Sequence, residues 1–221
     1  MELLDSLKIN EIFFSVQGEG SRAGLPCIFV RTHGCGLRCS WCDTPYALSH
    51  RDGGTLMNFA AIREEIVDYP CTFVELTGGE PLEQPQTIDL ARELLEDGYE
   101  VAVETGGHVD IGICDERMIR IVDMKPPGSG MAKRNRYENL DLLGEKDELK
   151  FVCSSLDDYA WARDLVVAHN LADRVGAILV SPVFGAVEPV DLVEAILADG
   201  LPIRFQIQMH KVIWDPEKRG V

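Results

Sequence analysis

The chain alternates short apolar runs with helix-like stretches, and this alternation constrains its fold more than any other feature. The runs rich in β-branched residues and short enough for strands are 27–31, 72–76, 100–104, 119–122, 149–152, 177–180 and 203–207. Segments with helical spacing lie between most of them, at 58–68, 86–97, 155–169 and 189–199. Strands that alternate with helices pair in parallel through right-handed crossovers. We therefore predict an α/β fold with parallel strands and helices outside. It should be a partial (β/α) barrel or an open sheet, because the repeats fall short of eight.

The length of 221 residues suits a single domain that spans 1–221. One stretch, 126–147, is polar and rich in glycine, and we interpret it as a long loop of functional importance or disorder. A tail follows at 212–221. No apolar stretch is long enough to cross a bilayer, and the first ten residues lack the apolar run of a signal peptide. We expect a cytoplasmic protein without a membrane partner.

The net charge of −16 argues against a nucleic acid as the main partner. Phosphate backbones repel such a surface, so solubility is the simpler reason for the acidic residues.

Polar or glycine-rich clusters follow almost every predicted strand. They lie at 31–42, 77–81, 105–107, 123–125, 181–182 and 208–211. The carboxyl ends of parallel strands meet at one edge of a sheet, where α/β proteins bind their ligands. The clusters should therefore converge on one site.

Seven cysteines without a secretion signal favour metal or redox chemistry over disulfides. Four of them are scattered, mostly in or beside apolar runs, and are predicted to fill the core: Cys27, Cys71, Cys114 and Cys153.

The other three cysteines, Cys35, Cys39 and Cys42, form a C-x3-C-x2-C motif directly after the first predicted strand. Three thiolates in one loop can hold three corners of a cubane iron–sulfur cluster. Zinc is an alternative, but a structural zinc site takes four ligands, and no fourth cysteine or histidine lies at ligand spacing downstream. His33 is close, but as a fourth ligand it would close the site. Chance spacing is the remaining alternative.

This motif, with an aromatic residue before its last cysteine, resembles the radical S-adenosylmethionine (SAM) superfamily. The Thr-Gly-Gly-Glu-Pro segment at 77–81 is a second match, because it looks like the GGE segment that binds the amino group of SAM there. The glycines let the backbone approach a ligand, and Glu80 can accept hydrogen bonds from an ammonium group.

Further segments narrow the resemblance to one family. The start of the chain, 10–20, reads N-E-x-F-x-x-x-Q-G-E-G, and together with 24–31, 42–44, 104–106, 123–125 and 208–211 it is similar to the 7-carboxy-7-deazaguanine synthases. The resemblance implies ring contraction of 6-carboxy-5,6,7,8-tetrahydropterin to 7-carboxy-7-deazaguanine, with release of ammonia, on the way to queuosine and related compounds. It also implies three cofactors: a 4Fe-4S cluster, SAM that is regenerated after each turnover, and Mg²⁺.

The resemblance also assigns residues to roles. The cluster would be held by Cys35, Cys39 and Cys42, and Mg²⁺ by the hydroxyl of Thr44. SAM would contact Trp41, Cys42, Asp43, Gly79, Glu80, Asp123, Met124, Lys125, Ser181 and Phe184. The pterin would contact Val16, Gln17, Gly18, Arg31, Thr77 and His210, with Arg31 facing its carboxylate and His210 reaching it from the last strand.

The resemblance implies partners as well: a homodimer and a flavodoxin-type electron donor. Flavodoxins are acidic, so docking needs a local basic patch, for which the candidates are Arg38, Lys133, Arg134 and Arg136. Two alternatives stay open. One is an activase of glycyl-radical enzymes from the same superfamily, and the other is a non-catalytic iron–sulfur or zinc protein. Some relatives end soon after the terminal His-Lys, whereas this chain continues. We therefore expect Trp214 to cap the site or to anchor the tail in a dimer interface.

Overall fold

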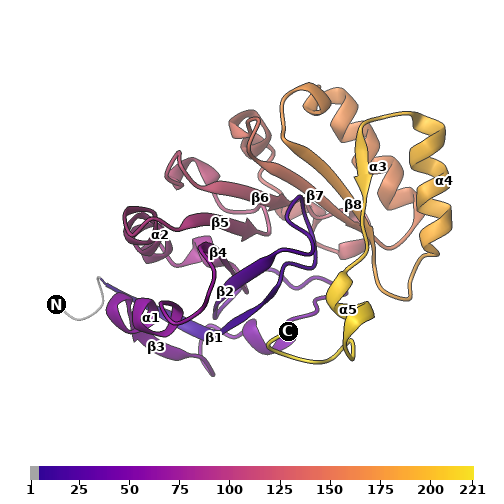
Figure 1. Ribbon diagram of the computed structural model, residues 1–221. Coiled ribbons are helices and arrows are strands. Elements are labelled where there is room, and N and C mark those ends of the chain that lie inside the picture. The colour runs from indigo at the N-terminus through magenta and orange to yellow at the C-terminus, as the bar shows by residue number, and fades with distance from the viewer. Residues whose placement is uncertain (1–4) are drawn as a thin grey trace.

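A computed structural model describes residues 5–221, and its frame is a nine-stranded sheet with the order β3-β1-β2-β4-β5-β6-β7-β8-β9 (Figure 1). Its strands are β1 (Ser6–Val16), β2 (Pro26–Thr32), β3 (Thr55–Asn58), β4 (Phe73–Gly78), β5 (Glu100–Thr105), β6 (Ile119–Asp123), β7 (Glu148–Cys153), β8 (Ala177–Pro182) and β9 (Ile203–Phe205). Neighbours from β2 through β4 to β9 pair in parallel. The outer strands β3 and β9 do not pair with each other, so the sheet stays open. The predicted α/β class is confirmed.

All of the predicted strands exist, but the prediction of parallel strands alone was incomplete. Strand β1 pairs antiparallel with both β2 and β3 at one side of the sheet. Most of β1 is half-buried without a clear alternation, and β3 has only four residues, most of them exposed. Neither therefore carries the apolar run that reveals a buried parallel strand.

The helices α1 (Phe59–Ile66), α2 (Gln86–Glu96), α3 (Leu156–Ala168) and α4 (Pro189–Asp199) match the predicted segments. Helix α1 begins where Asn58 accepts a hydrogen bond from the backbone of Ala61, and α3 begins in the same way at Ser155. Figure 1 shows α3 and α4 outside β7 and β8. A short helix, α5 (Met209–Ile213), was not predicted; the last strand ends at Phe205 instead of residue 207.

The stretch 126–147 contains no α-helix or strand, as predicted, but only 3₁₀ turns at Pro127–Ser129, Ala132–Arg134 and Tyr137–Leu142. Two amide side chains, the buried Asn139 and the half-buried Asn135, hold it in place. Asn139 donates to the carbonyl oxygen of Val109 at 2.8 Å, and Asn135 exchanges hydrogen bonds with the backbone of Lys125 at 2.8 and 2.9 Å.

Alternation along the parallel strands separates the core from the site. Val74 and Leu76 of β4 join the main apolar core, whereas Phe73, Glu75 and Thr77 point to the other face. The same rule puts Glu104 of β5, Asp123 of β6 and Lys150 of β7 on that inner face. The scattered cysteines lie in or against the core, as predicted. Among residues 5–221, no helix is both long and apolar enough to cross a membrane.

Candidate active site

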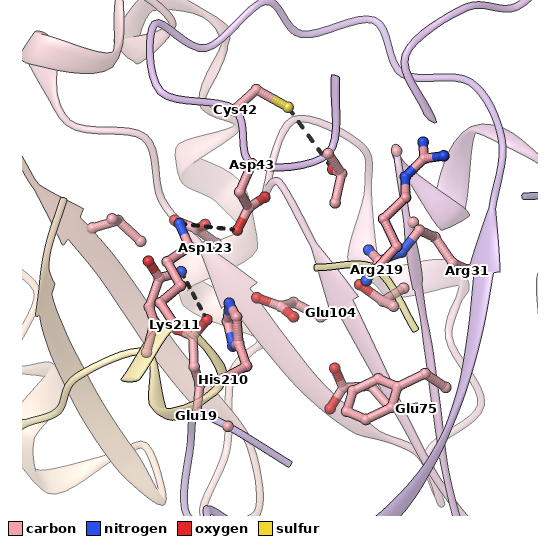
Figure 2. Close-up of a pocket in the computed structure, with 18 of the residues that line it drawn as sticks. Glu19, Arg31, Cys42, Asp43, Glu75, Glu104, Asp123, His210, Lys211 and Arg219 are labelled. Atoms are coloured by element: carbon pink, nitrogen blue, oxygen red, sulfur yellow. Dashed lines mark hydrogen bonds and ion pairs between the residues drawn. The ribbon is translucent and has the colours of Figure 1, made fainter. Parts of the chain in front are cut away.

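One pocket lies at the carboxyl ends of the parallel strands and brings together nearly all the residues that the sequence singled out (Figure 2). Every predicted site residue lines it except Glu80, Met124 and Ser181. Strand β1, the loop after β2, the ends of β4 to β7, helix α5 and the tail all contribute to its walls.

The carboxylate of Glu80, predicted to face SAM, makes its contacts with the protein and lies outside the pocket lining. It is fully buried, and Oε1 accepts hydrogen bonds from Thr105 Oγ1 at 2.8 Å and from the backbone of Leu82 at 3.1 Å. Its Oε2 accepts from the backbone of Gly106 at 2.8 Å. Glu80 therefore ties the end of β4 to the end of β5.

Met124 and Ser181 are fully buried and also lie outside the pocket lining. Met124 belongs to the apolar core, because it follows Asp123 and points to the opposite face. Ser181 lies within β8, and its Oγ has no hydrogen-bond partner within residues 5–221.

The loop that carries Cys35, Cys39 and Cys42 is fixed by the Thr-Gly-Gly-Glu-Pro segment. The backbone of Glu80 donates to the carbonyl oxygen of Gly34 at 2.8 Å, and Gly34 has a φ of +108°, which favours glycine. A side chain at Gly79 would overlap that same carbonyl oxygen. The two motifs that suggested the superfamily therefore pack directly on each other.

The donor set of this loop suits an iron–sulfur cluster with one open corner. All three thiols are free and line the pocket. No three His, Cys, Asp or Glu side chains within residues 5–221 stand at metal-ligand spacing, so the three sulfurs would have to move closer together to bind a cluster. Burial raises the pKa of Cys35 to about 12 and also raises that of Cys39. Thiols with raised pKa values keep their protons near neutral pH and would release them only when a metal binds the sulfur.

His33 is not available as a fourth ligand. It is buried outside the pocket lining, its Nδ1 lies 2.9 Å from Asn10 Nδ2, and its Nε2 lies 2.7 Å from the carbonyl oxygen of Asp52. This geometry supports a three-cysteine site over a four-ligand zinc site.

A buried ion network forms the floor of the pocket. Lys150 Nζ lies 2.7 Å from Glu104 Oε1 and 2.7 Å from Glu19 Oε2. Burial and the negative charge of Glu104 raise the pKa of Glu75, whose carboxylate accepts a hydrogen bond from Gln17 Nε2. Burial alone would also raise the pKa of Glu104, but attraction to Lys150 and a hydrogen bond from it bring this pKa below its usual value. Glu104 is therefore an ionised carboxylate that faces the pocket.

Other charged groups line the walls in pairs. Lys125 Nζ donates to Asp123 Oδ2 at 2.7 Å, while Asp123 Oδ1 is buried without a partner within residues 5–221. Lys211 Nζ lies 3.9 Å from Asp43 Oδ2. His210 faces the pocket from α5 rather than from the last strand, and burial lowers its pKa. Near neutral pH, its imidazole is therefore uncharged and can accept a proton.

The remaining wall holds Arg31 and the tail. Arg31 Nε donates to Glu11 Oε1 at 2.8 Å, and Tyr46 Oη donates to the same oxygen at 3.1 Å. Trp214 does not line the pocket, so it does not cap the site as one prediction had it. The part of the tail that does line it is Pro216, Lys218, Arg219, Gly220 and Val221.

The sequence interpretation missed Glu75, Glu104 and Lys150 as site residues. Each interrupts an apolar strand with a charge (FVELT, VAVET and LKFV). A charged residue inside a buried strand is costly unless it is paired, and that is the signal that identifies them.

Comparison with known proteins agrees with this site. Residues 29–127 match the family model described as "Radical SAM superfamily". The 7-carboxy-7-deazaguanine synthase of Chlorobaculum tepidum is 42% identical over 97% of both chains. The enzyme of the same name from Koribacter versatilis is 39% identical over 97% of this chain and all of the relative.

Solved structures show the same fold. QueE from Escherichia coli superimposes with a TM-score of 0.75 at 24% identity, covering 93% of this chain and 95% of QueE. SuiB from Streptococcus suis, with bound precursor peptide, gives a TM-score of 0.58 at 13% identity over 81% of this chain and 47% of SuiB. The sequence relatives, matched over almost their whole length, place this chain in the family of 7-carboxy-7-deazaguanine synthases, within the radical SAM superfamily.

Proposed function

We propose that the protein converts 6-carboxy-5,6,7,8-tetrahydropterin to 7-carboxy-7-deazaguanine with release of ammonia, and that residues 1–221 work as one radical SAM domain. One observation carries the proposal. Cys35, Cys39 and Cys42 line the same pocket as Gln17 and Arg31, which the family resemblance assigns to the pterin. A cluster site and a substrate site in one cavity are what radical chemistry requires, because the reacting groups must be held together and away from water.

The three cysteines would hold a 4Fe-4S cluster with an open corner for SAM, beside Trp41, Asp43, Gly79, Asp123 and Lys125. Held by these cysteines, a cluster would supply the one-electron reduction that radical chemistry on SAM requires. The buried Oδ1 of Asp123 has no partner within residues 5–221 and would accept a hydrogen bond from a polar group of the ligand. The Thr44 hydroxyl, 3.8 Å from Cys42 Sγ, is a hard oxygen donor suited to Mg²⁺.

The chain's own side chains would bind the pterin and handle its protons. Arg31 offers a guanidinium to the carboxylate, and Gln17 is held by Glu75 at the pocket floor. Glu104 is kept ionised by Lys150 and His210 is neutral, so both can accept hydrogen bonds from N–H groups of the pterin.

Anaerobic turnover tests this proposal directly. Cluster-loaded protein, incubated with 6-carboxytetrahydropterin, SAM, Mg²⁺ and dithionite, should form 7-carboxy-7-deazaguanine and ammonia, as detected by mass spectrometry. Omitting SAM or the reductant should abolish the product. Cleavage of SAM without any deazapurine would contradict the substrate while leaving the superfamily chemistry intact.

We further propose an acidic flavodoxin-type electron donor that docks beside the cysteine loop. The loop 126–147 packs there, since the backbone of Arg38 contacts Met131 Sδ at 3.3 Å and that of Ser40 donates to the carbonyl oxygen of Ser129 at 3.1 Å. Arg38, Lys133 and Arg134 are exposed. Arg136, a fourth candidate from the sequence, pairs with Asp110 at 3.1 Å, which weakens its part in the patch.

Reversing the charge of this basic patch should weaken binding of the electron donor without slowing the reaction in the active site. We expect the double variant K133E/R134E to raise the apparent KM for flavodoxin by about tenfold at low salt, because rim charges steer association. Its dithionite-driven turnover should stay at the wild-type rate. The matched control is K146E, which reverses the charge of an exposed lysine. Lys146 lies just before the start of β7, at the other edge of the sheet from the cysteine loop. An unchanged KM for flavodoxin in the double variant would contradict the docking site.

We also propose a homodimer. Helix α4 leaves Val190 and Leu197 on the surface, with 57% and 74% of these residues exposed. Light scattering of the cluster-loaded protein should give twice the mass of the chain, and a monomer at micromolar concentration would contradict it.

A further inference from the structure

The tail of the chain supplies a second arginine to the wall that holds Arg31. Residues 218–221 line the pocket, and the guanidinium carbon of Arg219 lies 3.2 Å from the centre of the Tyr46 ring. A guanidinium stacked on an aromatic ring is favourable and keeps its N–H groups free at the edges. Figure 2 shows the side chains of Arg219 and Arg31 next to each other at one end of the pocket.

Tyr46 is itself fixed in place. Its hydroxyl donates to Glu11 Oε1, the oxygen that also accepts from Arg31 Nε. The carboxylate of Glu11 thus orients Arg31 directly. It orients Arg219 indirectly, because it fixes the ring of Tyr46 on which Arg219 stacks. Arg219 is exposed, and its stack on the hydrogen-bonded Tyr46 reduces the ordering that it needs when a ligand arrives.

The charges on this wall do not cancel. Lys125, Lys150 and Lys211 of the pocket each lie within 4 Å of a carboxylate. Arg31 pairs with Glu11, but Arg219 has no ion pair among residues 5–221. Among residues 5–221, Glu11 is the only carboxylate within 4 Å of either guanidinium, and Glu104 acts on Arg31 from farther away. Two guanidinium groups with one ion-pair partner leave a positive charge at this wall of a chain whose net charge is −16. An anionic group on the ligand would balance it, and planar guanidinium groups match a carboxylate best.

We propose that Arg219, stacked on Tyr46, binds the carboxylate of the substrate together with Arg31, so that the tail determines the preference for a carboxylated pterin. This inference rests on the proposed function, because that function supplies the pterin. The ligand class is a flat heterocycle with a carboxylate on its rim.

Two stable fluorescent probes separate the role of the carboxylate from that of the ring. 6-Carboxypterin carries the group and pterin lacks it, and both can be titrated anaerobically into cluster-loaded protein with SAM. We expect Arg219→Ala to weaken 6-carboxypterin about tenfold, the cost of one charge-assisted contact, and to leave pterin unchanged. Arg219→Lys should restore part of the loss, since it keeps the charge but not the planar stack.

Two further variants control for charge and folding. Lys218→Ala removes the neighbouring charge of the tail and should weaken 6-carboxypterin less than Arg219→Ala does. Arg163→Ala removes a half-exposed arginine from the outer helix α3 and should bind both probes as the wild type does. The visible absorption and the melting temperature of each variant show whether the cluster and the fold are intact.

The results of these titrations separate the role of Arg219 from the choice of substrate. If the wild type binds 6-carboxypterin no better than pterin, the proposed substrate fails and the role of Arg219 fails with it. If the wild type prefers 6-carboxypterin but Arg219→Ala retains that preference, or Lys218→Ala removes it equally, only the role of Arg219 is overturned.

Discussion

Replacing Cys42 with alanine should give a folded protein that holds almost no iron–sulfur cluster and has no detectable turnover. With one of three thiolates missing, the loop retains only two protein ligands for a cluster that already has an open corner. Cys42 is half-buried in the pocket wall, and the removal of its thiol leaves the apolar core untouched. The measurement is iron and sulfide content after anaerobic reconstitution, together with the visible absorption of the cluster.

Cys114 provides the matched control. It is also half-buried and free, but it packs against the apolar core, away from the pocket. Cys114→Ala should bind a full cluster and turn over at a rate near that of the wild type. A cluster retained at full occupancy by Cys42→Ala would show that the metal is held elsewhere, and the assignment of the three-cysteine loop would be wrong.

Replacing Lys150 with methionine should destabilise the fold by about 3–5 kcal/mol near neutral pH, since breaking a buried ion pair leaves its partners uncompensated. The side chain of Lys150 is only 6% exposed, and two carboxylates, Glu19 and Glu104, lie within 2.7 Å of its amine. Denaturant unfolding of the cluster-loaded protein measures the loss. Lys146→Met is the control, because Lys146 is exposed and should change stability by less than about 0.5 kcal/mol.

The effect of Lys150→Met should depend on pH in a defined direction. In the wild type, the pKa of Glu104 is below its usual value, so the ionised carboxylate stabilises the fold above the unfolded-state pKa. That contribution disappears as the pH falls through the folded-state pKa. The difference between variant and wild type should therefore be largest near neutral pH and shrink in acid. A difference that is constant from neutral to acidic pH would mean that the Lys150–Glu104 pair does not carry the stability.

The strands were predictable because most are buried on both faces and read as continuous apolar runs. The helices were predictable from their helical spacing, and the hydrogen bonds of Asn58 and Ser155 explain where α1 and α3 begin. Strand β1 was not, because its half-buried residues show neither a continuous apolar run nor a strict alternation. Its residues form a strand by pairing antiparallel with β2, and the sequence of β1 alone does not show that pairing.

The site residues also divide into those that local motifs predicted and those that only the fold brings together. The cysteine loop and Gly79 are local motifs, and the fold brings them into contact as expected. Glu104 and Lys150 are far apart in the chain and become a pair only when β5 and β7 present them on the same face. The motif predicted Glu80 as a site residue, but its contacts with Thr105 and Gly106 come from the next strand and could not be predicted.

Turnover at limiting SAM tests most directly whether this protein carries out the ring contraction. In an anaerobic reaction with excess 6-carboxytetrahydropterin, Mg²⁺ and reductant, and with less SAM than enzyme, we predict many molecules of 7-carboxy-7-deazaguanine for each molecule of SAM. SAM should be recovered intact at the end. If the product never exceeds the SAM supplied, or if SAM is consumed while no deazapurine forms, the protein does not regenerate SAM in a ring contraction, and its proposed function is wrong.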